Sequence, residues 1–182
     1  HPDLIMDELM DFPEVDITWG NHDLHWLGAA MGNPALIASV VRQGISYNTF
    51  DLLEDGYGVN LRPLSAFAET AYRDDPCLAF HPKDEFNVNL FDTVEAELGA
   101  KMQKAMAVIQ FKLEGQLLRR RPEYGMDSRD LLSRVDYRKG TVTIDGREYP
   151  LRDSSFPTID PEDPLRLSPG EEELMRALTA SF

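Results

Sequence analysis

The longest regular pattern of apolar positions lies in the middle of the chain. Seven apolar residues recur there at intervals of three and four, the spacing that puts side chains on one face of an α-helix. They are Val94, Leu98, Met102, Ala105, Ile109, Leu113 and Leu117. Asp92 and Glu95 form an N-terminal capping pattern, and Arg119–Pro122 ends the segment. The pattern predicts a helix of about 25 residues whose methionine and alanine stripe packs in a core rather than around a cofactor.

Shorter stretches of helical spacing predict five more helices. The expected spans are 3–12, 24–31, 34–42, 63–72 and a last one that begins at Ser168. Pro13 ends the first, because proline cannot continue a helix. Pro34 suits the first turn of the third. The Ser168-Pro169-Gly170-Glu171 segment is typical of a capped N-terminus.

Two segments have the pattern of strands. Val15–Trp19 predicts one short core strand that ends in a sharp turn. Thr141–Ile144 and Arg147–Leu151 flank Asp145-Gly146, a pair that tolerates the positive φ angles of a two-residue turn, so we expect a β-hairpin at 141–151. The stretches 53–60, 73–92 and 156–161 predict loops. The fold class expected is α+β, a mostly helical chain with one short core strand and a small β-hairpin.

Length and charge restrict the function further. The chain has 182 residues, which predicts one domain or at most two. It carries 32 acidic and 18 basic residues, a net charge of −14, and this argues against binding nucleic acid or an anionic membrane surface. The acids are unevenly placed, since no lysine or arginine precedes Arg42. That excess is compatible with a solvated face or with half of a cation site, and composition does not decide between them.

Features that the sequence lacks also bear on the expected cellular location and on whether the chain is a piece of a longer one. The single cysteine, Cys77, excludes an internal disulfide and fits a reducing, cytoplasmic location. We find neither a signal peptide nor an apolar run long enough to span a membrane. The chain begins at His1 without an initiator methionine, so we expect a piece of a longer polypeptide.

The residues with the most chemical potential are Gly20-Asn21-His22-Asp23, directly after the expected strand. The Asn21 amide oxygen is a neutral, hard ligand suited to Mn²⁺, Mg²⁺ or iron. His22 can protonate a leaving alkoxide, and Asp23 can fix its tautomer. The carboxyl end of a strand is where open α/β sheets hold ligands. Taken alone, the tripeptide is better explained by a loop in which Asn21 or Asp23 caps the next helix.

Longer motifs extend this observation over nearly the whole chain. They are Trp19–Asp23 with Trp26–Ala30, Leu53–Leu64, Ile109–Gln116 and Phe156–Pro161. Together they resemble the class III (Firmicutes-type) fructose-1,6-bisphosphatases of the calcineurin-like metallophosphoesterase superfamily. The resemblance implies hydrolysis of fructose 1,6-bisphosphate to fructose 6-phosphate and phosphate in gluconeogenesis, at a binuclear Mn²⁺ site in an α/β sandwich. Carried onto this chain, it implies that Asn21 is a metal ligand, His22 the acid and Asp23 its orienting partner.

The resemblance is incomplete at both ends. The superfamily's Asp-x-His and Gly-Asp-x-x-Asp-Arg-Gly blocks should lie upstream, and beyond His25 only His81 remains as a later histidine. We therefore expect residues 1–33 to be an edge of the metallophosphoesterase core and 34–182 to be a family-specific, mainly helical region. The rest of the parent chain is an expected partner, and this polypeptide alone should neither hold two metals nor hydrolyse sugar phosphates.

Other residues and functions remain open. His25 could share a helical face with His22, and Arg62 or Arg119–Arg121 could bind phosphate, although basic residues also favour a helix C-terminus without any ligand. Cys77 has no histidine near it in sequence, and Asp160 and Asp163 fit turns. Two alternative functions compete with the bisphosphatase: a metallophosphoesterase with another substrate, and a non-catalytic helical interaction or regulatory module.

Overall fold

A computed structural model describes residues 2–81 and 93–182. The α-helices in these residues are α1 (Pro2–Met10), α2 (Asn21–Ala30), α3 (Pro34–Ser46), α4 (Arg62–Ala71), α5 (Thr93–Arg120) and α6 (Pro169–Thr179). A π-helical turn covers Leu52–Gly56, and 3₁₀ turns cover Leu78–Phe80, Pro122–Tyr124, Asp127–Arg129 and Leu132–Arg134. The strands β1 (Val135–Asp136), β2 (Thr141–Ile144) and β3 (Arg147–Pro150) form one antiparallel sheet in the order β1-β2-β3. The expected mostly helical α+β class is confirmed.

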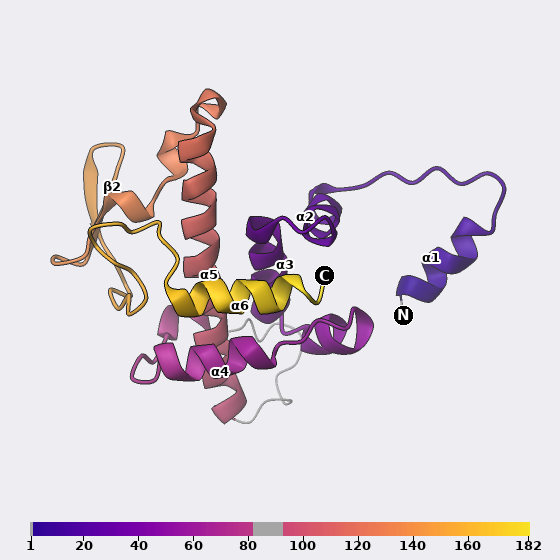
Figure 1. Ribbon diagram of the computed structural model, residues 1–182, viewed down its shortest axis with the longest axis horizontal. Coiled ribbons are helices and arrows are strands. Elements are labelled where there is room, and N and C mark those ends of the chain that lie inside the picture. The colour runs from indigo at the N-terminus through magenta and orange to yellow at the C-terminus, as the bar shows by residue number, and fades with distance from the viewer. Residues whose placement is uncertain (1, 82–92) are drawn as a thin grey trace.

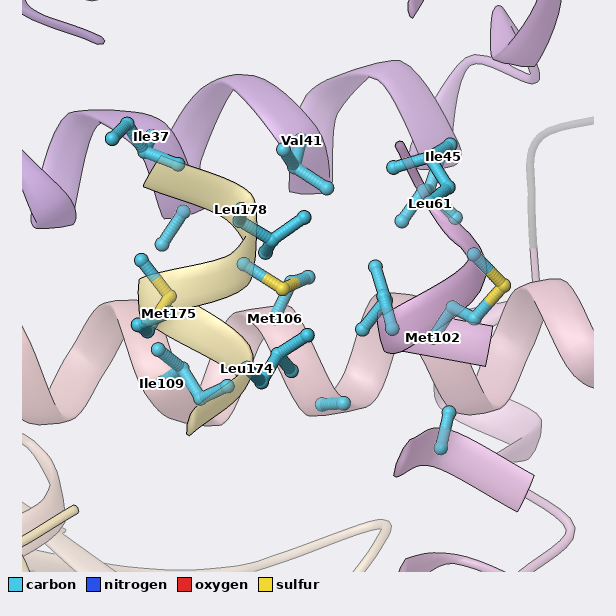
Figure 2. Close-up of a cluster of buried hydrophobic side chains, with 14 of the residues drawn as sticks. Ile37, Val41, Ile45, Leu61, Met102, Met106, Ile109, Leu174, Met175 and Leu178 are labelled. Atoms are coloured by element: carbon cyan, nitrogen blue, oxygen red, sulfur yellow. The ribbon is translucent and has the colours of Figure 1, made fainter. Parts of the chain in front are cut away.

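Helix α5 lies at the centre of the fold, with α3 and α4 packed against it and α6 packed across α3 and α4 (Figure 1). The middle of its predicted apolar stripe is buried: Met102 and Ile109, with the adjacent Met106, are at most 4% exposed, while Leu98 and Leu117 are partly buried. In Figure 2 the α6 residues Leu174, Met175 and Leu178 lie beside Met106 and Ile109, Met102 lies near Leu61, and Ile37, Val41 and Ile45 of α3 face the same cluster. The sequence periodicity therefore identified the core helix correctly.

The same helix buries two lysines, which the apolar periodicity did not reveal. Lys104 has no solvent exposure, and its Nζ donates to Asp75 at 2.6 Å and to Asp153 at 2.7 Å. The ammonium also lies 5.6–5.8 Å from the ring centroids of Tyr72, Phe80 and Phe156, a cation–π arrangement. Its charge thus joins the loop after α4 to the loop after β3.

Two turns further along α5, Lys112 is equally buried. Its Nζ donates to Glu171 of α6 and to the Thr158 carbonyl, both at 2.7 Å. Gln116, one turn later, donates to the Leu165 carbonyl at 2.6 Å. These contacts fasten the irregular segment 153–165 along α5, although that segment has no helix or strand of its own.

The expected core strand at Val15–Trp19 is wrong. Residues 15–20 have no regular structure and are exposed, and none of the described strands pairs with them. A strand needs a neighbour to satisfy its backbone N–H and C=O groups, so the local β pattern alone does not produce one. Helix α1 precedes this segment and stands apart from the other helices (Figure 1).

Other differences concern the boundaries of elements. Helix α2 begins three residues earlier than expected, and α3 continues four residues further. The expected hairpin is confirmed, with φ angles of 48° at Asp145 and 75° at Gly146, but the short strand β1 was not foreseen. Ser168 and Glu171 form the expected capping box of α6. The expected cap at Asp92 lies outside the described residues.

We predict that Lys112→Met lowers the free energy of unfolding by about 3–5 kcal/mol, because it leaves the Glu171 carboxylate buried without a cation. Urea unfolding monitored by circular dichroism measures the change. The double variant Lys112→Met with Glu171→Leu should recover only part of the loss, because it removes the buried charge but also the Glu171 cap of α6, which is worth about 1 kcal/mol. As a control, Arg166→Met removes an exposed pair with Asp160 and should cost about 0–1 kcal/mol. Equal losses in both single variants would contradict the prediction.

We also predict acid sensitivity from Asp75. Burial on its own raises the pKa of this carboxyl, but hydrogen bonds from Lys104 and the Cys77 N–H outweigh it, so the pKa lies below its usual value. Because the pKa of Asp75 is lower in the folded chain than in the unfolded chain, its carboxylate stabilises the fold at pH values above the unfolded-state pKa. This stabilisation is lost as the pH falls through the folded-state pKa. The free energy of unfolding should therefore decline below about pH 4. Asp75→Asn should be less stable at neutral pH and show a flatter decline; an unchanged slope would refute this.

Candidate functional site

The candidate site lies on the first turn of α2. Gly20 is the N-cap residue, with an extended backbone (φ −90°, ψ −178°), and Asp23 Oδ2 accepts a hydrogen bond from its N–H at 2.7 Å. Asn21, His22 and Asp23 therefore form part of the helix rather than a turn before it. The capping interpretation that the sequence left open is observed for Asp23. A carboxylate in this turn also interacts favourably with the positive end of the helix dipole.

His22 is held from the neighbouring helix. Its Nδ1 lies 3.0 Å from Oε1 of Gln43 on α3. The same carboxamide reaches His25, whose Nδ1 lies 3.3 Å from Gln43 Nε2 and 3.1 Å from the Ser39 hydroxyl. The two imidazole rings are 6.1 Å apart between centroids, so the expected shared helical face exists. His22 itself is exposed to solvent.

Gln43 and Ser39 were missed by the sequence analysis. A signal for them was present: they lie four residues apart in a helix whose buried positions are almost all apolar, so they must share one face. What the sequence does not contain is which histidines that face meets. This information depends on how α2 packs against α3.

A complete metal centre is not formed by these residues. Asn21 is exposed and offers one amide oxygen. In the part of the chain that the structure describes, no three His, Cys, Asp or Glu side chains come together in a group able to hold a metal ion. The donor set at α2 therefore fits one ligand position of a metal site and not a whole coordination sphere.

The other candidate residues are the arginines at 62 and 119–121 and the aspartate at 160. Arg119 lies within 4.0 Å of carboxylates of Asp130 and Asp163, and Arg121 pairs with Glu123 at 3.1 Å, so both guanidinium groups have acidic partners. Asp160 accepts from the Glu162 N–H, as expected of a turn residue. Arg62 opens α4 and is exposed, so its phosphate-binding role stays a prediction.

The contacts described above for Asn21, His22 and Asp23 do not include Cys77 or His81. Cys77 is fully buried, and burial raises the pKa of its thiol to about 12, which keeps it protonated at neutral pH. A nucleophilic role is therefore as poor a fit as the sequence indicated. His81 is exposed and lines a small cavity with Arg73, Glu97 and Lys101. Among residues 2–81 and 93–182, no helix is long and apolar enough to cross a membrane.

Comparison with known proteins identifies the family. Residues 1–182 match the family described as Firmicute fructose-1,6-bisphosphatase, and the chain belongs to it. It is 51% identical over 179 residues to fructose-1,6-bisphosphatase class 3 of Parabacteroides distasonis, which covers 98% of this chain and 27% of that protein. It is 50% identical over 182 residues to the protein of the same name from Listeria monocytogenes serotype 4b (strain CLIP80459), covering 100% of this chain and 28% of that protein.

A third relative, fructose-1,6-bisphosphatase class 3 of Bacteroides fragilis (strain YCH46), is 48% identical over 179 residues, 98% of this chain and 27% of its own length. The chain thus spans a little over a quarter of the length of the curated relatives it matches. No solved structure matches it.

The observed cap generates a prediction for α2. Asp23→Ala removes the acceptor of the Gly20 N–H, and loss of a helix N-terminal cap costs about 1 kcal/mol. Amide hydrogen exchange in the first turns of α2 should then accelerate about fivefold. Asp16→Ala, which changes an exposed acid in the irregular segment before α2, is the control and should leave these rates unchanged. Unaltered exchange in Asp23→Ala would mean that the cap contributes nothing.

Proposed function

We propose that this chain is part of a fructose-1,6-bisphosphatase that hydrolyses fructose 1,6-bisphosphate to fructose 6-phosphate and phosphate. The observation that carries the proposal is the identity of about half of all residues, along the whole chain, with proteins of that name. A sugar bisphosphate is then the substrate. A place in gluconeogenesis and a cytoplasmic location belong to the same proposal.

In this proposal His22 is the general acid. Loss of phosphate from a sugar leaves an alkoxide, a poor leaving group that needs a proton, and a positioned imidazole supplies one effectively near neutral pH. His22 is exposed at the end of a helix, and its Nδ1 is hydrogen-bonded to Gln43. In the imidazolium, the form that can act as an acid, Nδ1–H is taken by Gln43, and Nε2–H is the group available to donate to substrate. Asp23 contributes by capping the turn that carries His22, and an additional orienting role for Asp23 stays part of the proposal.

Asn21 is proposed as one ligand of a metal centre, with Mn²⁺ as the expected ion. Its carboxamide oxygen is neutral and hard, which suits Mn²⁺, and its exposure leaves that oxygen accessible. When bound, the metal would acidify a water molecule and neutralise phosphoryl charge. The remaining ligands would have to come from outside the residues described here.

The N-terminal segment exposes several large apolar side chains. Leu4, Ile5 and Met10 of α1 are each at least 60% exposed, and so are Phe12 and Trp19. Exposed apolar residues so close together are typical of a surface that is covered by another part of a protein. We propose that residues 1–33 form an edge of a metallophosphoesterase α/β sandwich, completed by the rest of a longer chain, and that 34–182 form a helical region beside it.

The test uses the full-length protein that contains these residues. With Mn²⁺ present, phosphate release from fructose 1,6-bisphosphate should be catalysed, and His22→Ala should lower kcat by about 100-fold or more. Ser133→Ala, distant in sequence and exposed, is the control and should keep the wild-type kcat. A panel of other phosphomonoesters distinguishes the alternative of a phosphoesterase with a different substrate.

The isolated 182-residue chain provides the complementary measurement. Because it lacks a ligand cluster among its described residues, we expect no turnover above its own His22→Ala variant with Mn²⁺ added. Clear turnover by the isolated chain would show that the ligands are present in it after all.

A further inference from the structure

The polar side chains between α2 and α3 form one connected group. Gln43 lies at its centre, with its oxygen 3.0 Å from His22 Nδ1 and its nitrogen 3.3 Å from His25 Nδ1 and 3.4 Å from the Ser39 hydroxyl. We infer that Gln43 is a positioning residue for His22. The inference deepens the function proposed above and rests on it, because His22 needs positioning only if it transfers a proton.

The chemistry follows from which atom faces the imidazole. A carboxamide oxygen is only an acceptor, so it pairs with an Nδ1 that carries a hydrogen. An imidazole acting as an acid from Nε2 is the imidazolium, in which both nitrogens carry hydrogen: Nδ1–H donates to Gln43, and Nε2–H is left for the leaving oxygen. That bond fixes the rotation of the ring, and with Nδ1 engaged by Gln43 it leaves Nε2 as the nitrogen available to the substrate. An acid must present its proton at one particular point near the leaving oxygen, and a ring free to rotate would do so only part of the time.

Three features hold the carboxamide in place. Its nitrogen contacts Ser39, which is 2% exposed, and His25, which is partly buried, so its own orientation is defined by neighbours. Gln43 also belongs to α3, whose Ile37, Val41 and Ile45 are buried against α5 and α6 (Figure 2). A side chain on a packed helix positions its partner more accurately than one on a loop.

Asp23 and Gln43 have different roles at this site. Asp23 Oδ2 accepts from the Gly20 N–H at 2.7 Å, so its observed hydrogen bond serves the helix cap. The hydrogen bond observed at His22 is made instead with the oxygen of Gln43, 21 positions later in the chain. The helical region that begins at residue 34 therefore contributes directly to the site rather than only flanking it.

Steady-state kinetics of the full-length, Mn²⁺-loaded protein test the inference. Gln43→Met keeps the size of the side chain and removes its hydrogen bonds, so kcat should fall about 10- to 100-fold while KM for fructose 1,6-bisphosphate changes by less than about threefold. Gln43→Glu retains an acceptor oxygen for His22 and should restore most of the lost kcat. Gln116 lies on α5, and Gln116→Met removes its hydrogen bond to the Leu165 carbonyl; this variant is the matched control and should leave kcat unchanged.

A double variant distinguishes positioning from a general effect on the fold. If Gln43 acts through His22, Gln43→Met should have no further effect on kcat in a His22→Ala background. An equal loss in both backgrounds, or a wild-type kcat in Gln43→Met while His22→Ala is inactive, overturns the inference and leaves the proposed function intact. A wild-type protein without bisphosphatase activity overturns both. Should Gln43→Met fail to fold, Gln43→Asn, which withdraws the amide by one methylene, carries the same expectations.

Discussion

The burial of two ammonium groups in α5 is the constraint on which most of the fold depends. A charge without water is tolerated only when an opposite charge and further hydrogen bonds surround it. Lys104 and Lys112 obtain these from Asp75, Asp153 and Glu171, which lie in three separate parts of the chain. The central helix therefore cannot pack fully until the loop after α4, the loop after β3 and the start of α6 have all reached it. This explains how a long stretch without regular structure keeps a defined path across the core.

Local signals in the sequence predicted the elements that depend on local physics. The span of α5, the turn at Asp145-Gly146 and the cap at Ser168 each follow from residues close together in the chain. The strand expected at Val15–Trp19 failed because pairing is a property of two segments, and no pattern within one of them reveals the other. The partners of Lys104 and Lys112 were hidden for the same reason: periodicity shows which face is buried, but not which distant carboxylate meets it.

The sequence predicted part of the candidate site. Here too, the local interactions could be predicted, and those between distant segments could not. Asn21, His22 and Asp23 were identified from a short motif and from its longer context, and the cap made by Asp23 is a local interaction that the motif allowed. Gln43 required knowledge of how two helices pack. The motif is consequently supported on one side by a well-packed helix, α3, and continues on the other into an exposed segment and α1, whose apolar side chains meet solvent. The described residues thus cover the side of the motif that faces α3 and leave the side that leads to α1 exposed.

One carboxylate oxygen near the start of α6 has an implication for how this family changes over time. Glu171 Oε2 accepts from Lys112 Nζ at 2.7 Å and from the Ser168 N–H at 2.7 Å, so a single atom serves both an ion pair and a helix cap. A substitution at Glu171 removes both interactions at once. A substitution at Lys112 leaves the cap intact, but the Glu171 carboxylate is then buried without a cation. Mutational drift at these sites is thus coupled: an apolar replacement of Lys112 becomes acceptable only in a lineage where residue 171 loses its charge and another residue takes over the cap.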